Sequence, residues 1–287
     1  MDFETFIKDR NQPVVFKNFI NEWSARKWTL QHLAQYLKDT EIKCKIGPKF
    51  QGIFETQCLY LDITIDDFIE WCSSKSRPSN PLHQIDKDKY FCYLDYKYMV
   101  ELFSDNEEIL QSVDWGVFGL TDRYGNDSTI WIGSDGCTTP CHYDTYGFNL
   151  VSQISGRKKW YLFPPGDMES LYPTRIPYEE SSVFSEVNIT NTDFNRHPHF
   201  KNCHPYMVIL EPGDVLYVPK HWWHYVQCLD TAISVNTWVE MEDDNETRVR
   251  EAITRILISS LSSSNNDSNN SLVNPTEVCS RILHNSY

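Results

Sequence analysis

The chain has 287 residues, of which 40% are hydrophobic and 14% aromatic, and this composition excludes a chain that is disordered throughout. Its net charge of −14 makes nucleic acid an unlikely partner, because phosphate backbones repel an acidic surface, whereas a basic protein or peptide is compatible. No apolar run approaches the roughly 20 residues that span a bilayer, and the charged start MDFETFIKDR lacks the apolar stretch of a signal peptide. We therefore expect a soluble, cytoplasmic protein with no membrane partner, and the composition leaves the nucleus open as a location.

The nine cysteines are spread along the chain, and none belongs to a C-x-x-C pair. An odd number without a secretory signal is typical of reduced thiols, and not of a disulfide framework or a structural zinc site. We therefore expect free cysteines.

The N-terminal region, residues 1–114, is predicted to mix strands and helices. PVVFKNF (13–19) is rich in β-branched and aromatic residues, as strands are. Thr29 and Thr64 each precede apolar residues at helical spacing, so each is placed to cap a helix. We expect these α/β elements to pack on the domain that follows.

Residues 115–241 have a different sequence pattern, with many short β-branched and aromatic runs separated by Gly and Pro. Such a pattern favours a β-sandwich or a barrel. The Pro-Gly pair at 212–213 predicts a tight hairpin between the runs YMVIL and DVLYVP. Three tryptophans in this region are expected to pack in the core: Trp222, Trp223 and Trp238.

The C-terminal region begins with a predicted helix over residues 242–261. Acidic residues come first, which suits the helix dipole, and apolar residues then follow at helical spacing. The stretch SSSNNDSNNS opens a low-complexity tail, residues 262–287, that we expect to be partly disordered. The apolar positions of the predicted helix are Val249, Ile253, Ile256 and Leu257.

A possible metal site starts from the motif CHYD, in which His142 and Asp144 lie two residues apart. Residues i and i+2 of a strand point to the same face, so both side chains could bind one ion. Two imidazoles and one carboxylate suit a ferrous centre, because they leave three coordination positions open. The third ligand would come from a distant strand in VPKHWWHYV, which offers His221 or His224.

A 2-oxoglutarate co-substrate would need a cation for its distal carboxylate and polar groups beside it. The basic run GRKKWYLFPP supplies cations, and Thr139 lies three residues before His142. Asn149 and Asn236 are predicted inside strands, where Asn is otherwise depleted, so we expect both amides to have partners.

The motifs TPCHYD, GRKKWYLFPP, PGDVLYVPKHWWHYV and SVNTW resemble, in order and spacing, the JmjC-type Fe(II)/2-oxoglutarate oxygenases of the factor-inhibiting-HIF-like group. The resemblance covers residues 129–240, and a weaker similarity is found in the N-terminal stretch QPVVFKNF. It implies a mainly β fold: a double-stranded β-helix, of the jelly-roll or cupin type, with its core at 115–241. N-terminal α/β elements and a C-terminal helix would flank this core.

The resemblance also implies roles for individual residues. His142, Asp144 and His224 would be the iron ligands, which leaves His221 structural. Lys158 fits the pattern G-x-K-x-W and would pair with the distal carboxylate of 2-oxoglutarate. The remaining residues implied to bind this co-substrate are Thr139, Asn149, Asn236 and Tyr93.

The activity implied by the resemblance is oxygenation with Fe(II), 2-oxoglutarate and O2. We expect hydroxylation of a protein side chain; demethylation would differ only in that the hydroxylated carbon is an N-methyl group. No methyl-ammonium cage or chromatin reader is evident in the sequence. One alternative is a non-catalytic binding protein that sequesters a protein partner. Another is oxidation of an RNA base, which the acidic composition disfavours.

Two expectations concern partners. The stretch LYPTRIPYEESSVF (171–184) is most similar to members of the group that associate with small heat-shock proteins, which implies such a protein as partner or substrate. The amphipathic segment 246–261 is compatible with a homodimer interface, as in some relatives, and equally with packing on its own domain.

Overall fold

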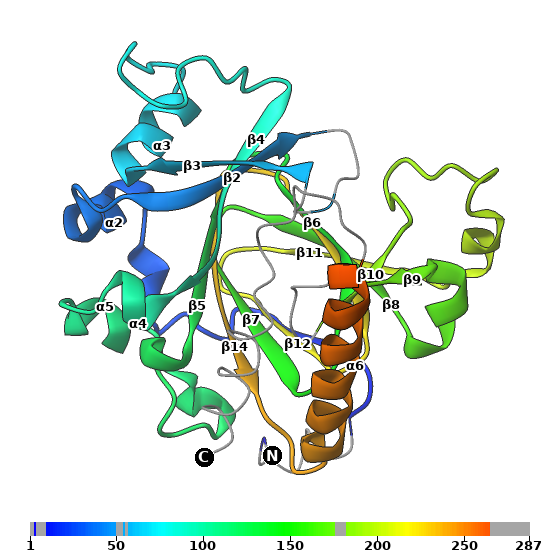
Figure 1. The fold of residues 1–287 in the computed structure, drawn as a ribbon. Coiled ribbons are helices and arrows are strands. Elements are labelled where there is room, and N and C mark those ends of the chain that lie inside the picture. Colours follow the sequence, from blue (N-terminus) through cyan, green and yellow to red (C-terminus); the bar gives the residue numbers. More distant parts are fainter. Residues whose placement is uncertain (1–2, 4–9, 50–53, 55–56, 176–181, 265–287) are drawn as a thin grey trace.

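Two antiparallel sheets dominate the computed structural model, which describes residues 3, 10–49, 54, 57–175 and 182–264 (Figure 1). In spatial order the eight-stranded sheet contains β1 (Val14–Phe16), β12 (Val215–Val218), β7 (Phe148–Ser155), β14 (Ala232–Val239), β5 (Thr129–Gly133), β4 (Tyr90–Tyr98), β2 (Ile42–Pro48) and β3 (Leu59–Ile63). The six-stranded sheet contains β11 (Tyr206–Leu210), β8 (Lys158–Phe163), β13 (Trp223–Cys228), β6 (Thr138–Asp144), β10 (Ser182–Ser185) and β9 (Pro173–Thr174).

The two sheets pack face to face through a buried apolar layer. Strands β7 and β12 contribute from the larger sheet, and β8, β11 and β13 contribute from the smaller one. Alternate side chains of each strand point into this layer, as expected for a sandwich with two inner faces. The mainly β, jelly-roll fold predicted from the sequence is therefore confirmed. The buried layer consists of Val151, Trp160, Leu162, Leu210, Leu216, Val218, Trp222 and Val226.

The N-terminal region continues the larger sheet, because β4 pairs with β5 and β2 pairs with β4. Both predicted caps are confirmed. The Thr29 hydroxyl accepts a hydrogen bond from the backbone of His32, and Thr64 forms a reciprocal capping box with Asp67. The helices that follow, α2 (Leu30–Leu37) and α3 (Ile65–Cys72), bury Leu33 and Phe68 in the main core cluster.

Short helical segments connect the strands. Two are α-helical, α4 (Met99–Leu102) and α5 (Glu107–Gln111). The 3-10 helices in the described residues are η1 (Ser24–Lys27), η3 (Trp115–Phe118), η4 (Gly125–Asp127), η5 (Pro165–Leu171) and η6 (Pro198–Asn202).

The turn at 212–213 forms as predicted, but the predicted hairpin is wrong. Strand β11 pairs with β8 and strand β12 pairs with β7, so the chain crosses from one sheet to the other. Gly213 has a φ of +105°, and its N–H donates to Gln153 at 2.8 Å, which fixes the corner against β7. A turn signal reports a change of direction and does not specify which sheet each strand joins.

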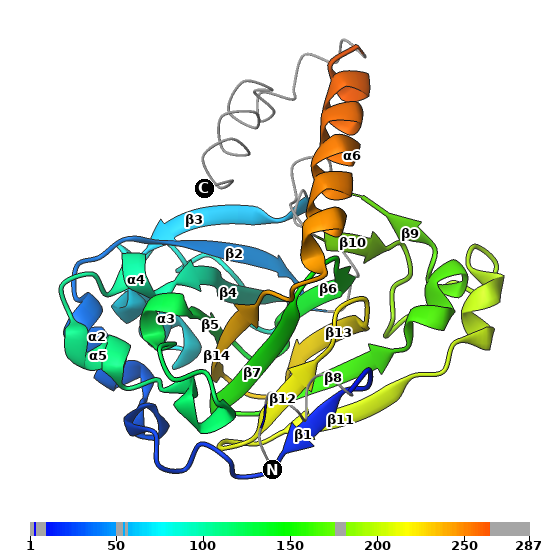
Figure 2. The same cartoon turned by 90° about the horizontal axis from the view of Figure 1, so that it is seen from below.

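The C-terminal helix α6 runs over Asp244–Ser264 and projects from the sheets (Figure 2). It begins two residues later than predicted and ends three residues later, so positions 262–264, expected to be in the disordered tail, are helical. The rest of that tail lies outside the described residues. The described part of the chain contains no helix of the length and apolarity that a membrane span requires.

Candidate metal centre and co-substrate pocket

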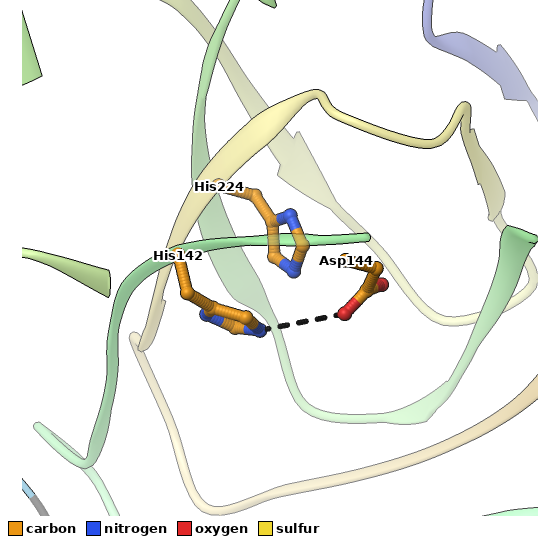
Figure 3. A group of neighbouring side chains, drawn as sticks. All are labelled: His142, Asp144 and His224. Atoms are coloured by element: carbon orange, nitrogen blue, oxygen red, sulfur yellow. Dashed lines mark ion pairs between the residues drawn. The ribbon is translucent and has the colours of Figure 1, made fainter. Parts of the chain in front are cut away.

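Strands β6 and β13 bring His142, Asp144 and His224 together (Figure 3). His142 and Asp144 share one face of β6, and His224 is the direct cross-strand partner of His142. One ligand atom from each residue lies within 4.8 Å of the other two. Nε2 of His142 is 3.9 Å from Oδ1 of Asp144, and the two imidazole centroids are 4.2 Å apart. Of the two histidines that the spacing argument left open, His224 is the one that joins the pair.

Both imidazoles are oriented by backbone carbonyls. Nδ1 of His142 lies 2.8 Å from the carbonyl oxygen of Pro140, and Nδ1 of His224 lies 3.0 Å from that of Trp222. A carbonyl only accepts, so each Nδ1 carries a proton and Nε2 is the nitrogen left to bind a metal. Burial, and next the neighbouring His142, lower the pKa of His224 to about 4. His224 is therefore a neutral imidazole at pH 7, the form that binds metals.

The carboxylate of Asp144 is held from a second side. Its Oδ2 accepts a hydrogen bond from Nε1 of Trp238 at 3.1 Å, so Oδ1 faces His142. The expectation that Trp238 packs in the core is wrong, whereas Trp222 and Trp223 are buried there as predicted. Nε2 of His221 lies 2.9 Å from the carbonyl oxygen of Thr145, so His221 shapes the turn after Asp144.

A cavity of about 390 Å³, including its open mouth, lies beside the triad. Seven residues singled out in the sequence line it: Tyr93, Thr139, His142, Asn149, Lys158, His224 and Asn236. Six residues that were not assigned to the site also line it: Trp131, Val151, Trp160, Val226, Ser234 and Trp238.

Lys158, the first residue of β8, lies in the wall of this cavity and is only 2% exposed. Its Nζ donates to Oγ of Ser234 at 2.6 Å and lies 3.3 Å from the hydroxyl of Tyr93. No carboxylate of the described residues forms an ion pair with Lys158. Lys45 is also 2% exposed, but it is paired with Asp95. Because an unpaired buried cation is costly, the Lys158 ammonium is suited to binding an anion from solution.

Polar side chains continue along the same wall. Nδ2 of Asn236 donates to Oδ1 of Asn149 at 2.8 Å, and Nε1 of Trp131 donates to Oδ1 of Asn236 at 2.7 Å. Both asparagines therefore have partners, as expected from their placement in strands. Ser234, Asn236 and Trp238 alternate along β14, so they share one face. The same period-two rule, applied from Asn236, would have found both Ser234 and Trp238 in the sequence.

The Lys158 end of the cavity is closed by close packing. The Tyr93 ring is buried there, and burial raises the pKa of its phenol. Gly133 lies across from Tyr93 in β5, and a Cβ at that position would come within 2.3 Å of Sγ of Cys137. Only glycine fits there, so the strands can approach closely behind the lysine.

Comparison with known proteins agrees with this architecture. A family model described as "Cupin-like domain" matches residues 1–245, so the chain belongs to the cupin-like family, in its JmjC branch. Among curated proteins, "HSPB1-associated protein 1" of Bos taurus is 48% identical over 272 residues, which cover 93% of this chain and 56% of that protein. Its Homo sapiens counterpart is 47% identical over 277 residues, which cover 95% and 57%.

More distant relatives also belong to the JmjC group. "Lysine-specific demethylase 8" of Xenopus tropicalis is 26% identical over 231 residues, which cover 79% of this chain and 48% of that protein. The chain therefore spans little more than half the length of the relatives most similar to it. The family resemblance inferred from the motifs is confirmed.

Proposed function

We propose that this chain is an Fe(II)- and 2-oxoglutarate-dependent oxygenase that hydroxylates a protein side chain. The observation that carries the proposal is Lys158, a buried cation with no counter-ion among the described residues, in the same cavity as the His142 and His224 imidazoles. A donor set of two imidazoles and one carboxylate fits Fe(II) and leaves positions for a co-substrate and oxygen. A dicarboxylate such as 2-oxoglutarate would satisfy the lysine and reach the metal side of the cavity.

In this proposal the chain's own residues bind and orient the reactants. His142, Asp144 and His224 would hold the iron, and the Trp238 indole would keep one oxygen of Asp144 turned toward it. Lys158 would receive the distal carboxylate of the co-substrate. When bound, the iron and 2-oxoglutarate supply the oxidising chemistry that protein side chains cannot. The residues expected to line the co-substrate site are Tyr93, Thr139, Asn149 and Asn236.

The partner in this proposal is a small heat-shock protein. The names of the Bos taurus and Homo sapiens relatives state an association with HSPB1, and each relative aligns with at least 93% of this chain. The same names favour a second candidate, a non-catalytic protein that sequesters its partner. The two functions are compatible in one chain. Loss of the iron site would abolish turnover in the first and leave partner binding unchanged in the second.

Spectroscopy in the absence of oxygen tests the enzyme proposal without knowledge of the substrate. Addition of Fe(II) and 2-oxoglutarate to the purified chain should give the visible charge-transfer band of the chelated co-substrate. His142→Ala should abolish this band, because it removes one of three ligands. His204→Ala is the matched control, since that side chain is exposed and outside the site. A folded wild-type protein without the band would contradict the enzyme proposal and favour the binding protein.

The homodimer remains part of the proposal as well. On α6, the side chains of Val249, Ile253 and Leu257 are all more than half exposed. Apolar residues that recur on a projecting helix are typical of an interface. Light scattering should give the mass of two chains for the wild type and of one chain for Ile253→Glu.

A further inference from the structure

Strand β11 is an edge of the six-stranded sheet that lacks the usual protection. Edge strands in natural proteins are short, charged, or carry proline, because their unpaired backbone groups would otherwise recruit another strand. Of the other three edges, β1 has three residues, β9 has two and begins with Pro173, and β3 carries Asp62. Strand β11 has five residues, YMVIL, without a charge or a proline.

The exposed side chains of β11 are apolar on both of its faces. Tyr206 is 59% exposed and Met207 is 58% exposed, although neither is at a chain end. Val208 and Leu210 point inward and join the apolar layer between the sheets. An added strand would therefore find apolar neighbours on both faces, with its alternate side chains beside Met207 on one face and Val208 on the other.

The segment that leads into β11 is basic, in contrast to the chain as a whole. Residues 194–210 contain no Asp or Glu, whereas the complete chain has a net charge of −14. Lys159 adds another cation, since it is the cross-strand partner of Ile209. A segment that docks here would be favoured by acidic residues next to its apolar run. Among the described residues Lys201 has no acidic partner, whereas Arg196 lies 3.9 Å from Glu186 and His204 lies 2.9 Å from Asp167.

We propose that the outer edge of β11 binds an extended segment, apolar with acidic flanks, of the small heat-shock protein partner. This inference rests on the partner part of the proposed function. Backbone hydrogen bonds would supply affinity, and the alternating side chains would supply specificity, as in other cases of strand addition. Because β8 lies between β11 and the His224 strand β13, the added strand would not pair with the strand that carries the metal ligand.

Binding of purified HSPB1 to the full chain tests the docking site. Met207→Glu should weaken binding about tenfold or more. It places a negative charge at the centre of an apolar contact, where the acidic flanks of the partner segment also repel it. Lys201→Glu should weaken binding less and reduce its dependence on salt. Leu59→Glu, on the β3 edge with 52% exposure, is the matched control and should leave the affinity unchanged. Thermal unfolding and the iron–co-substrate band verify that each variant is folded.

Hydrogen exchange distinguishes strand addition from a contact through side chains alone. Bound HSPB1 should slow the exchange of backbone amides within 206–210, and not of those within β3. Equal affinity for wild type and Met207→Glu, or protection confined to α6, would overturn the docking site while the partnership stands. No binding of HSPB1 to the wild type would overturn both this inference and the partnership. The charge-transfer band would still report on the enzyme proposal.

Discussion

The two ends of the cavity are built in different ways. At the metal end, His142 and Asp144 come from one strand, and both are partly accessible. At the other end, the surroundings of Lys158 come from separate strands: Tyr93 from β4 and Ser234 from β14. The metal end is thus a local arrangement on two paired strands, whereas the lysine end depends on the register of several strands.

The two ends of the cavity also differ in the electrostatic cost of their buried groups. At the metal end, His224 is neutral in the free protein, and Nδ1 of each histidine bonds to a backbone carbonyl. The lysine end holds a buried ammonium group whose partners in the described part of the chain are the hydroxyl groups of Tyr93 and Ser234. Binding of a dicarboxylate would relieve that charge, so we expect the free protein to be less stable than the loaded one.

The largest effect on binding is expected from Lys158→Met. Loss of a charged hydrogen bond to the distal carboxylate should weaken 2-oxoglutarate about a hundredfold, which corresponds to ~3 kcal/mol. Iron binding should be unchanged, since Lys158 is not a ligand of the triad. Because the substitution removes an unpaired buried charge, the free protein should not lose stability. Titration of 2-oxoglutarate into the Fe(II) protein and thermal unfolding measure both quantities.

Lys45→Met is the control for this prediction, because Lys45 is equally buried but has Asp95 as its partner. Its loss leaves a carboxylate buried without a counter-ion, which should lower the free energy of unfolding by roughly 3–5 kcal/mol. The affinity of the folded protein for 2-oxoglutarate should change little. A lower free energy of unfolding for Lys158→Met than for Lys45→Met would contradict the predicted difference between the two lysines.

A smaller effect is expected from Trp238→Phe at the metal end. The substitution keeps the aromatic ring but removes the N–H that donates to Oδ2 of Asp144. Groups that orient a metal ligand in this way typically contribute about tenfold or more to metal affinity, and we expect a loss of that order for Fe(II). Competition with a coloured chelator measures it. In Trp131→Phe, which loses the bond to Asn236, the affinity for 2-oxoglutarate should fall and that for iron should not.

The metal end was predictable from the sequence to a greater extent than the lysine end. The i, i+2 spacing of His142 and Asp144 places both on one face of any strand, whatever its neighbours. The choice between His221 and His224 depended on the register of β13 against β6, which no local pattern encodes. The family resemblance, and not the spacing, pointed to His224.

Two errors have the same physical origin. The turn at 212–213 was correct, but its two strands join different sheets, because pairing partners are decided by burial across the whole sandwich. Trp238 was expected in the core because large apolar residues usually lie there. Its indole N–H, however, donates a hydrogen bond to the Asp144 carboxylate. In both cases the local preference, for a turn or for an apolar environment, was identified correctly. The tertiary contacts then determined which sheet each strand joins and where the side chain lies.

The smallest effect is expected in the two capped helices of the N-terminal region. Thr64→Ala removes the capping box of α3, in which Thr64 Oγ1 accepts from the backbone N–H of Asp67 at 3.1 Å and the Asp67 carboxylate accepts in return. Loss of such a cap should lower the free energy of unfolding by about 1 kcal/mol. Thr29→Ala, which lacks the reciprocal bond, should lower it by less. Denaturant titrations measure both.

Since α3 contributes to the core and not to the cavity wall, neither variant should alter the affinity of the folded protein for 2-oxoglutarate. A change in that affinity would mean that β4, and with it Tyr93, shifts when the helix loosens, so that the lysine end depends on the N-terminal region for its geometry as well as its stability.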